Sequence, residues 1–76
     1  MEERTILVVD DDPVATEYLR LALEEQFHGV RTASGGVDAL SVIRRQSPSL
    51  VVSDLRMPEM DGFTLLALAR EQCPEV

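Results

Sequence analysis

Three aspartates in this sequence occupy positions from which they could share one ligand. Asp10 and Asp11 follow the apolar run of residues 5–9, and Asp54 follows the apolar run of residues 50–53. If the two runs are neighbouring parallel strands, the three carboxylates converge outside the carboxyl ends of the strands, where open α/β sheets bind their ligands. Like charges held close together disfavour ionisation, and a divalent cation relieves that conflict. Hard oxygen ligands with open positions favour Mg²⁺, which keeps several waters and also binds phosphoryl oxygens.

Three short runs rich in apolar and β-branched residues predict the strands: residues 5–9, 30–33 and 50–53. The first and third runs are apolar almost throughout, which is typical of strands buried on both faces of a parallel sheet. A helical pattern follows each strand, and such alternation predicts an α/β fold with right-handed crossovers. The expected strand order is 2-1-3, the start of a doubly wound sheet.

The first helix is expected over residues 13–26. Asp12 is a good N-cap, and Pro13 is a good first helical residue. Apolar residues at helical spacing predict its buried face, namely Val14, Tyr18, Leu21 and Ala22, widened by Leu19 and Leu23. Tyr18 is therefore expected in the core or at its rim.

Two further helices complete the expected pattern. Ser34 is expected to cap the second helix, which ends before Ser47 and Pro48. The third helix is expected over residues 62–72. The residues predicted to be buried are Val37, Leu40 and Ile43 in the second helix and Phe63, Leu66, Ala67 and Ala69 in the third. His28 is expected to cap a helix end, and Met57 and Met60 are expected to pack the loop before the third helix.

Composition and charge exclude several classes of function. A chain of 76 residues allows one domain at most. The net charge of -7 repels phosphate backbones, so direct nucleic-acid binding by this piece is not expected. The single cysteine, Cys73, excludes an intrachain disulfide and fits a reducing compartment. No apolar run approaches the roughly 20 residues of a membrane helix, and no signal peptide is evident, so we expect a soluble, cytoplasmic protein.

The stretch ILVVDDDP, combined with the later stretch LVVSDLRMPEMDGF, resembles the response-regulator receiver domain of two-component signalling, a CheY-like module with a flavodoxin-like fold. The resemblance covers essentially the whole chain. It implies that Asp54 accepts a phosphoryl group from a phosphohistidine on a sensor histidine kinase or a phosphotransfer protein. It also implies that Asp11 and Asp54 bind Mg²⁺ directly, that Asp10 binds it through water, and that the backbone carbonyl of Arg56 is a further ligand. Phosphoryl transfer requires positioning and a cation rather than other covalent chemistry, so the chain is not expected to be an enzyme.

The same resemblance implies that part of the family's fold has no counterpart in these 76 residues. Receivers of this family have five strand–helix units, and the sequence supplies three. The family's Ser or Thr after the fourth strand and Lys after the fifth have no candidate, since the sequence contains no lysine. We therefore expect residues 1–76 to form a partial receiver domain with an impaired switch. Its third strand becomes a sheet edge, which predicts a homo-oligomer formed through that edge.

Two other functions stay open. The pattern Asp10-x-Asp12 after a strand is similar to haloacid-dehalogenase-like phosphohydrolases, although Pro13-Val14 replaces their usual Gly-Thr and their Lys is absent. A receiver scaffold could also serve as a non-switching dimerisation or docking module. Asp12 is better explained as an N-cap than as a ligand, and Asp61 is better explained as a turn residue.

Overall fold

Six elements alternate along the part of the chain that the computed structural model describes, which is residues 5–27, 29–54 and 56–74. They are β1 (Thr5–Val9), α1 (Pro13–Leu23), β2 (Gly29–Ala33), α2 (Gly36–Arg45), β3 (Leu50–Ser53) and α3 (Gly62–Gln72). The predicted alternation of strands and helices is confirmed. The prediction for His28 lies outside the described residues.

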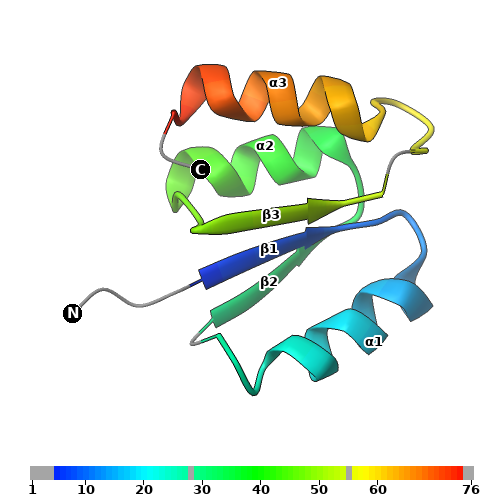
Figure 1. The fold of residues 1–76 in the computed structure, drawn as a ribbon. Coiled ribbons are helices and arrows are strands. Elements are labelled where there is room, and N and C mark those ends of the chain that lie inside the picture. Colours follow the sequence, from blue (N-terminus) through cyan, green and yellow to red (C-terminus); the bar gives the residue numbers. More distant parts are fainter. Residues whose placement is uncertain (1–4, 28, 55, 75–76) are drawn as a thin grey trace.

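The sheet has β1 in its centre, paired in parallel with β2 on one side and β3 on the other. The strand order is β2-β1-β3, as predicted. Val9, the last residue of β1, lies opposite Ala33 of β2 and Ser53 of β3, so all three strands end at the same edge. Helix α1 covers one face of the sheet, and α2 and α3 cover the other (Figure 1). The fold is therefore α/β, with three units of a flavodoxin-like doubly wound sheet.

The core lies mainly between the sheet and the pair α2–α3. Successive side chains of a strand point to opposite faces, and Leu7 and Val9 of β1 belong to the main buried cluster on the α2–α3 face. The other members of that cluster are Ala33, Ala39, Leu40, Ile43, Met57, Leu65 and Ala69. Ile6 and Val8 are also buried, on the face of α1. Alternate side chains of β1 are therefore buried on both faces of the sheet.

Helix α1 presents a different face to the sheet from the one predicted. Val14, Tyr18 and Leu21 are 76%, 73% and 56% exposed, so the predicted burial of this stripe is wrong. Ala22 is exposed as well, and the apolar side chains that are half-buried are Ala15, Leu19 and Leu23. Both sets satisfy helical spacing, because apolar residues occupy most of the circumference of α1. The helix also ends at Leu23 rather than at residue 26, because the Gln26 N–H donates three residues back to the carbonyl of Leu23, as in a tight turn, and not four residues back.

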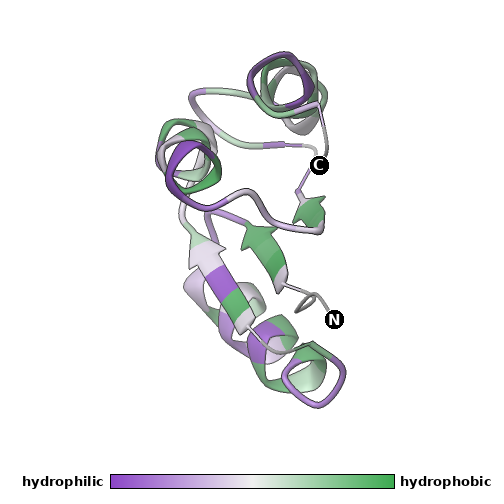
Figure 2. Cartoon of the chain, turned by 90° about the vertical axis from the view of Figure 1, so that its left-hand side faces the viewer, coloured by the Kyte–Doolittle hydropathy of each residue, from purple (hydrophilic) through white to green (hydrophobic). Residues whose placement is uncertain are grey.

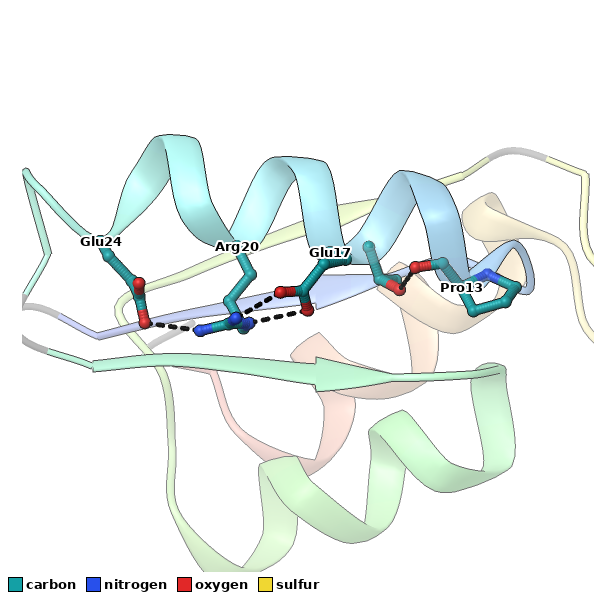
Figure 3. A network of polar contacts seen from close by, with 5 residues as sticks. Pro13, Glu17, Arg20 and Glu24 are labelled. Carbon is teal, nitrogen blue, oxygen red and sulfur yellow. Dashed lines mark hydrogen bonds and ion pairs between the residues drawn. The ribbon is translucent and has the colours of Figure 1, made fainter.

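Local ion pairs stabilise α1, which buries no side chain completely. The guanidinium of Arg20 lies between Glu17 and Glu24 (Figure 3). It donates through Nε to Glu17 Oε1 at 3.0 Å and through Nη1 to Glu24 Oε2 at 2.7 Å. The bond to Arg20 lowers the pKa of Glu17, and that carboxylate raises the pKa of Arg20. Pairs three and four residues apart add modestly to the stability of a helix.

Helix α2 begins at Gly36, which is buried. Its N-cap is Gly35, which has no side chain to form a capping bond, so the predicted cap at Ser34 is wrong. The backbone N–H of Ser34 instead donates to Asp38 Oδ2 at 3.3 Å. Val37 is 62% exposed, contrary to the prediction. The residues of α2 that are buried are Gly36, Ala39, Leu40 and Ile43.

Helix α3 begins after Asp61, whose Oδ1 accepts the backbone N–H of Thr64 at 2.7 Å. This hydrogen bond is the main cause that lowers the pKa of Asp61. The helix buries Leu65 and Ala69, whereas Phe63 is 71% exposed. Of the residues predicted to be buried, Ala69 is buried, Leu66 is half-buried, and Phe63 and Ala67 are exposed. In the described residues, no helix combines the length and the hydrophobicity that a membrane crossing requires.

The two edges of the sheet differ in hydropathy. In Figure 2 a hydrophilic band crosses the edge strand β2, whereas the central strand β1 is hydrophobic. Arg31 and Thr32 of β2 are both exposed. A charged side chain on an edge strand discourages pairing with another chain. Strand β3, with the sequence LVVS, has no such charge.

Candidate functional site

Asp10 is held at the carboxyl end of β1 by the pairing with β2. Its backbone N–H donates to the carbonyl of Ala33 at 3.1 Å, which extends the ladder by one residue. Its Oδ1 accepts the backbone N–H of Asp12 at 3.0 Å. This side-chain-to-backbone bond is an Asx turn. The turn fixes a half-buried carboxylate at the sheet edge.

The next two aspartates have different surroundings. Asp11 is exposed at the tip of the turn. Asp12 Oδ1 accepts the backbone N–H of Val14 at 3.0 Å, so Asp12 is the N-cap of α1, as predicted. The capping bond occupies one oxygen of Asp12, the second aspartate of the haloacid-dehalogenase-like pattern.

Asp54 is held at the end of β3 in the same way. Its backbone N–H donates to the carbonyl of Val9 at 2.9 Å, which extends the pairing of β1 with β3. Its Oδ1 accepts the backbone N–H of Arg56 at 3.3 Å. The carboxylate is half-buried, and the Arg56 side chain is exposed. Both the strand ladder and the loop therefore orient Asp54.

These positions bring the three carboxylates together, as the sequence predicts. One oxygen each from Asp10, Asp11 and Asp54 lies within 4.8 Å of the other two. Two oxygens bound to one Mg²⁺ at about 2.0–2.1 Å are at most about 4.2 Å apart. The three oxygens are thus close enough for one cation to lie among them, and three hard oxygen donors with open positions suit Mg²⁺.

Among the described residues, no basic side chain forms an ion pair with the cluster. In the part of the chain that the structure describes, the ion pairs are those of Arg20 on α1, and none involves a carboxylate of the cluster. Two of the three carboxylates are half-buried and one is exposed. A cation could therefore reach the cluster from solvent and relieve its mutual repulsion.

An open cleft of about 430 Å³ adjoins the cluster on the side of β2. It is lined by Asp10, Asp11, Pro13, Thr16, Thr32, Ala33, Ser34 and Asp38. Thr32, Ser34 and Asp38 were not predicted to line a site, and Ser34 was expected only as a helix cap. The position of β2 could have indicated them, because the end of this parallel strand lies at the same edge as the aspartates.

The loop before α3 matches its predicted packing role. Met57 is buried, and Met60 is half-buried against the main cluster. Asp61 caps α3, in agreement with a structural role rather than a ligand role. The Arg56 carbonyl as a metal ligand stays a prediction.

Comparison with known proteins gives a consistent result. Residues 6–76 match the family described as the response regulator receiver domain. An uncharacterised 14.6 kDa protein of Leptolyngbya boryana is 46% identical over 71 residues, which are 93% of this chain and 54% of that protein. The probable transcriptional regulatory protein TcrX of Mycobacterium tuberculosis is 40% identical over 70 residues, which are 92% of this chain and 30% of TcrX.

A solved structure shows the same arrangement of elements. The chemotaxis protein CheY4 of Vibrio cholerae superposes with a TM-score of 0.89 at 27% identity, covering 97% of this chain and 62% of CheY4. The chain thus spans about half, or less, of the length of the curated relatives described above. Receiver domains are signalling modules of two-component systems, and they typically bind Mg²⁺ at an acidic cluster. Given the match over residues 6–76 and the shared fold, this chain belongs to the response regulator receiver domain family.

Proposed function

We propose that this domain accepts a phosphoryl group on Asp54, with Mg²⁺ held by the acidic cluster. The observation that carries the proposal is the convergence of Asp10, Asp11 and Asp54 within 4.8 Å at the carboxyl edge of the sheet. Asp11 and Asp54 would bind the cation directly, Asp10 would bind it through water, and the Arg56 carbonyl would add a ligand. The bound cation would neutralise charge on the phosphoryl oxygens during transfer.

The transfer itself requires little covalent chemistry from the protein beyond the attack by Asp54. A carboxylate oxygen of Asp54 attacks the phosphorus of a phosphohistidine, the P–N bond breaks, and the imidazole leaves and takes a proton. The product is an acyl phosphate on Asp54. The Asp54 backbone N–H donates to the Val9 carbonyl, and the Asp54 carboxylate accepts the Arg56 N–H. These hydrogen bonds orient the carboxylate before the reaction, which is the kind of positioning that phosphoryl transfer depends on.

The proposed donor is a sensor histidine kinase or a phosphotransfer protein, because the family works in two-component systems. The proposed setting is the cytoplasm. The domain would act as a receiver in signal transduction and not as an enzyme with turnover.

We also propose that two copies pair through the free edge of β3. Among the described strands, β3 has β1 as its neighbour on one side only. Leu50 and Val52 are 46% and 38% exposed, and the strand has no charged residue to oppose pairing. A twofold axis would place the same apolar strand on both sides of the interface. A native mass equal to two chains would support this proposal, and a monomer at all concentrations would contradict it.

The phosphorylation proposal is tested by incubating the chain with Mg²⁺ and a small phosphodonor and recording the intact mass. We expect a gain of one phosphoryl group in the wild type and none in Asp54→Asn. Asp61→Asn is the matched control, because it makes the same change of charge while Asn still caps α3. A gain that persists in Asp54→Asn, or a folded wild-type chain that gains nothing, would contradict the proposal.

A further inference from the structure

The first turn of α2 and the loop before α3 approach each other unusually closely at Gly36. A Cβ built on Gly36 would lie 2.6 Å from Met60 Sδ, 3.0 Å from Met60 Cγ and 2.8 Å from Met60 Cβ. Gly36 is buried, and no described glycine has a positive φ. The glycine therefore supplies space rather than an unusual backbone conformation. The neighbouring Gly35 differs, because a Cβ there would meet nothing within 4 Å.

The contact with Met60 Cβ is the one that matters. The thioether of Met60 could turn away from an added methyl group, because it is the far end of a flexible side chain. The Cβ of Met60 is fixed to the backbone and cannot turn away. Bringing its 2.8 Å separation to an ordinary contact of 3.4 Å requires roughly 0.6 Å of movement in the loop or in α2.

The loop cannot absorb such a movement at Met60 alone, because it is anchored on both sides of that residue. Toward α3, Asp61 caps the helix through Thr64. Toward β3, Met57 is buried in the core, and the Arg56 backbone N–H donates to Asp54 Oδ1. A displaced Met60 therefore strains the segment that includes Arg56, whose N–H orients the Asp54 carboxylate.

We infer that Gly36 is a positioning residue for the cation and phosphoryl site. Because Gly36 has no side chain, Met60 can pack against α2 and hold the loop before α3 in place. The effect on Mg²⁺ and phosphoryl transfer rests on the proposed function. Functional groups need to be held within about 0.5 Å of their working geometry, and the required movement is of that size. A misplacement of about 1 Å can lower a rate by roughly 100-fold. Gly36→Ala is therefore expected to weaken Mg²⁺ binding several-fold and to slow phosphorylation about 10-fold.

The test compares Gly36→Ala with Gly35→Ala in the full chain, using titration with Mg²⁺ alone and the intact mass after phosphodonor treatment. Gly35→Ala is the matched control, since it adds the same methyl group at the adjacent position, where nothing lies within 4 Å. We expect Gly35→Ala to behave as wild type. Backbone amide chemical shifts of metal-free protein provide a second readout, and we expect Gly36→Ala to shift the amides of Arg56 and Met57 while Gly35→Ala leaves them in place.

Substitutions at Met60 separate positioning from a general loss of structure. Met60→Gly removes all three atoms that an added methyl group would meet, and Met60→Ala removes two of them. The effect of Gly36→Ala on Mg²⁺ affinity should therefore persist in Met60→Ala, which keeps the Cβ atom, and be absent in Met60→Gly. Should Met60→Gly fail to fold, an effect that disappears in Met60→Ala would still contradict the inference, because the Cβ contact remains there.

The outcomes distinguish this inference from the proposed function. If the wild type binds no Mg²⁺, the proposed function fails, and the amide shifts still show whether Gly36 positions the loop. If the wild type binds Mg²⁺ and Gly36→Ala binds it equally well with unshifted Arg56 and Met57 amides, the inference is overturned. Lower stability of Gly36→Ala with unchanged Mg²⁺ affinity of the folded protein would also overturn it, since that result indicates a purely structural role.

Discussion

On one face of the sheet, Leu7 and Val9 of β1 pack into a cluster that α2 and α3 complete, whereas α1 is the helix on the opposite face. That opposite face has Ile6 and Val8 fully buried, yet Leu50 and Val52, which lie opposite them in β3, are 46% and 38% exposed. Helix α1 buries no side chain completely, while α2 buries four residues and α3 three. The α2–α3 face is therefore the densely packed half of the domain.

The acidic cluster joins these two halves. Asp10 and Asp11 lead into α1, on the thinly packed face, and Asp54 leads into the loop that Met57 and Met60 tie to the dense face. A cation bound by all three carboxylates would link the two halves. The geometry of the site therefore depends on both faces of the sheet, whereas the stability of the fold depends mainly on the dense face.

The largest expected effect is on the dense face. Ile43→Ala should lower the free energy of unfolding by about 2–5 kcal/mol, because it leaves a cavity in a fully buried position. The whole chain is expected to have only about 4–11 kcal/mol of stability, from roughly 0.05–0.15 kcal/mol per residue. Leu19→Ala on half-buried α1 should cost about 1–2 kcal/mol, since less apolar surface is lost. Urea unfolding measures both, and equal losses would contradict the asymmetry of the two faces.

A smaller effect is expected at the β3 edge. Val52→Lys places a charge on the strand and should raise the dissociation constant of the proposed dimer at least about 10-fold, because charged edge strands resist pairing. Light scattering across a dilution series measures this change. Val37→Lys is the control, since Val37 is exposed on α2 and away from the edge. Equal dissociation in the two variants would show that β3 is not the interface.

The smallest expected effect is a pH dependence at the start of α3. The Thr64 N–H holds the pKa of Asp61 below its usual value. The folded state therefore keeps this carboxylate ionised to lower pH than the unfolded state does. Its contribution to stability is complete above the unfolded pKa of about 3.9 and is lost as the pH falls through the lower folded value.

Comparing wild type with Asp61→Asn isolates this contribution, because the other carboxylates titrate in both proteins. Wild type should lose stability relative to the variant as the pH falls below about 4. Thermal unfolding at a series of pH values measures the difference. Parallel curves across the acid range would show that the Asp61 bond makes no such contribution.

The sequence was enough to predict the strand order and the convergence of the aspartates. Both follow from apolar runs that end in carboxylates and from the rule that parallel strands end at one edge. The buried face of α1 could not be predicted in the same way, because Val14 and Tyr18 recur at helical spacing just as Leu19 and Leu23 do. The position of the sheet determines which of the two apolar faces of α1 is buried, and that position cannot be read from the sequence pattern.

Helix α3 shows the same limit. The predicted set combined Phe63, which is exposed, with Ala69, which is buried, and omitted Leu65. The contact between Gly36 and Met60 was also beyond prediction, because it joins segments that are distant in sequence and depends on how α2 and α3 pack together. Local patterns thus predicted the elements and the ends of the strands, whereas tertiary packing determined the helix faces and the support of the site.

Titration of the metal-free chain with Mg²⁺, followed through backbone amide shifts, tests most directly the claim that three carboxylates form one cation site. We predict a single binding event that shifts the amides of Asp10, Asp11 and Asp54 together. We predict that Asp11→Asn and Asp54→Asn each weaken it at least about 10-fold, as expected for the loss of a charged ligand, and that Asp61→Asn leaves it unchanged. Shifts that arise at separate Mg²⁺ concentrations, or equal affinities in all three variants, would contradict the account.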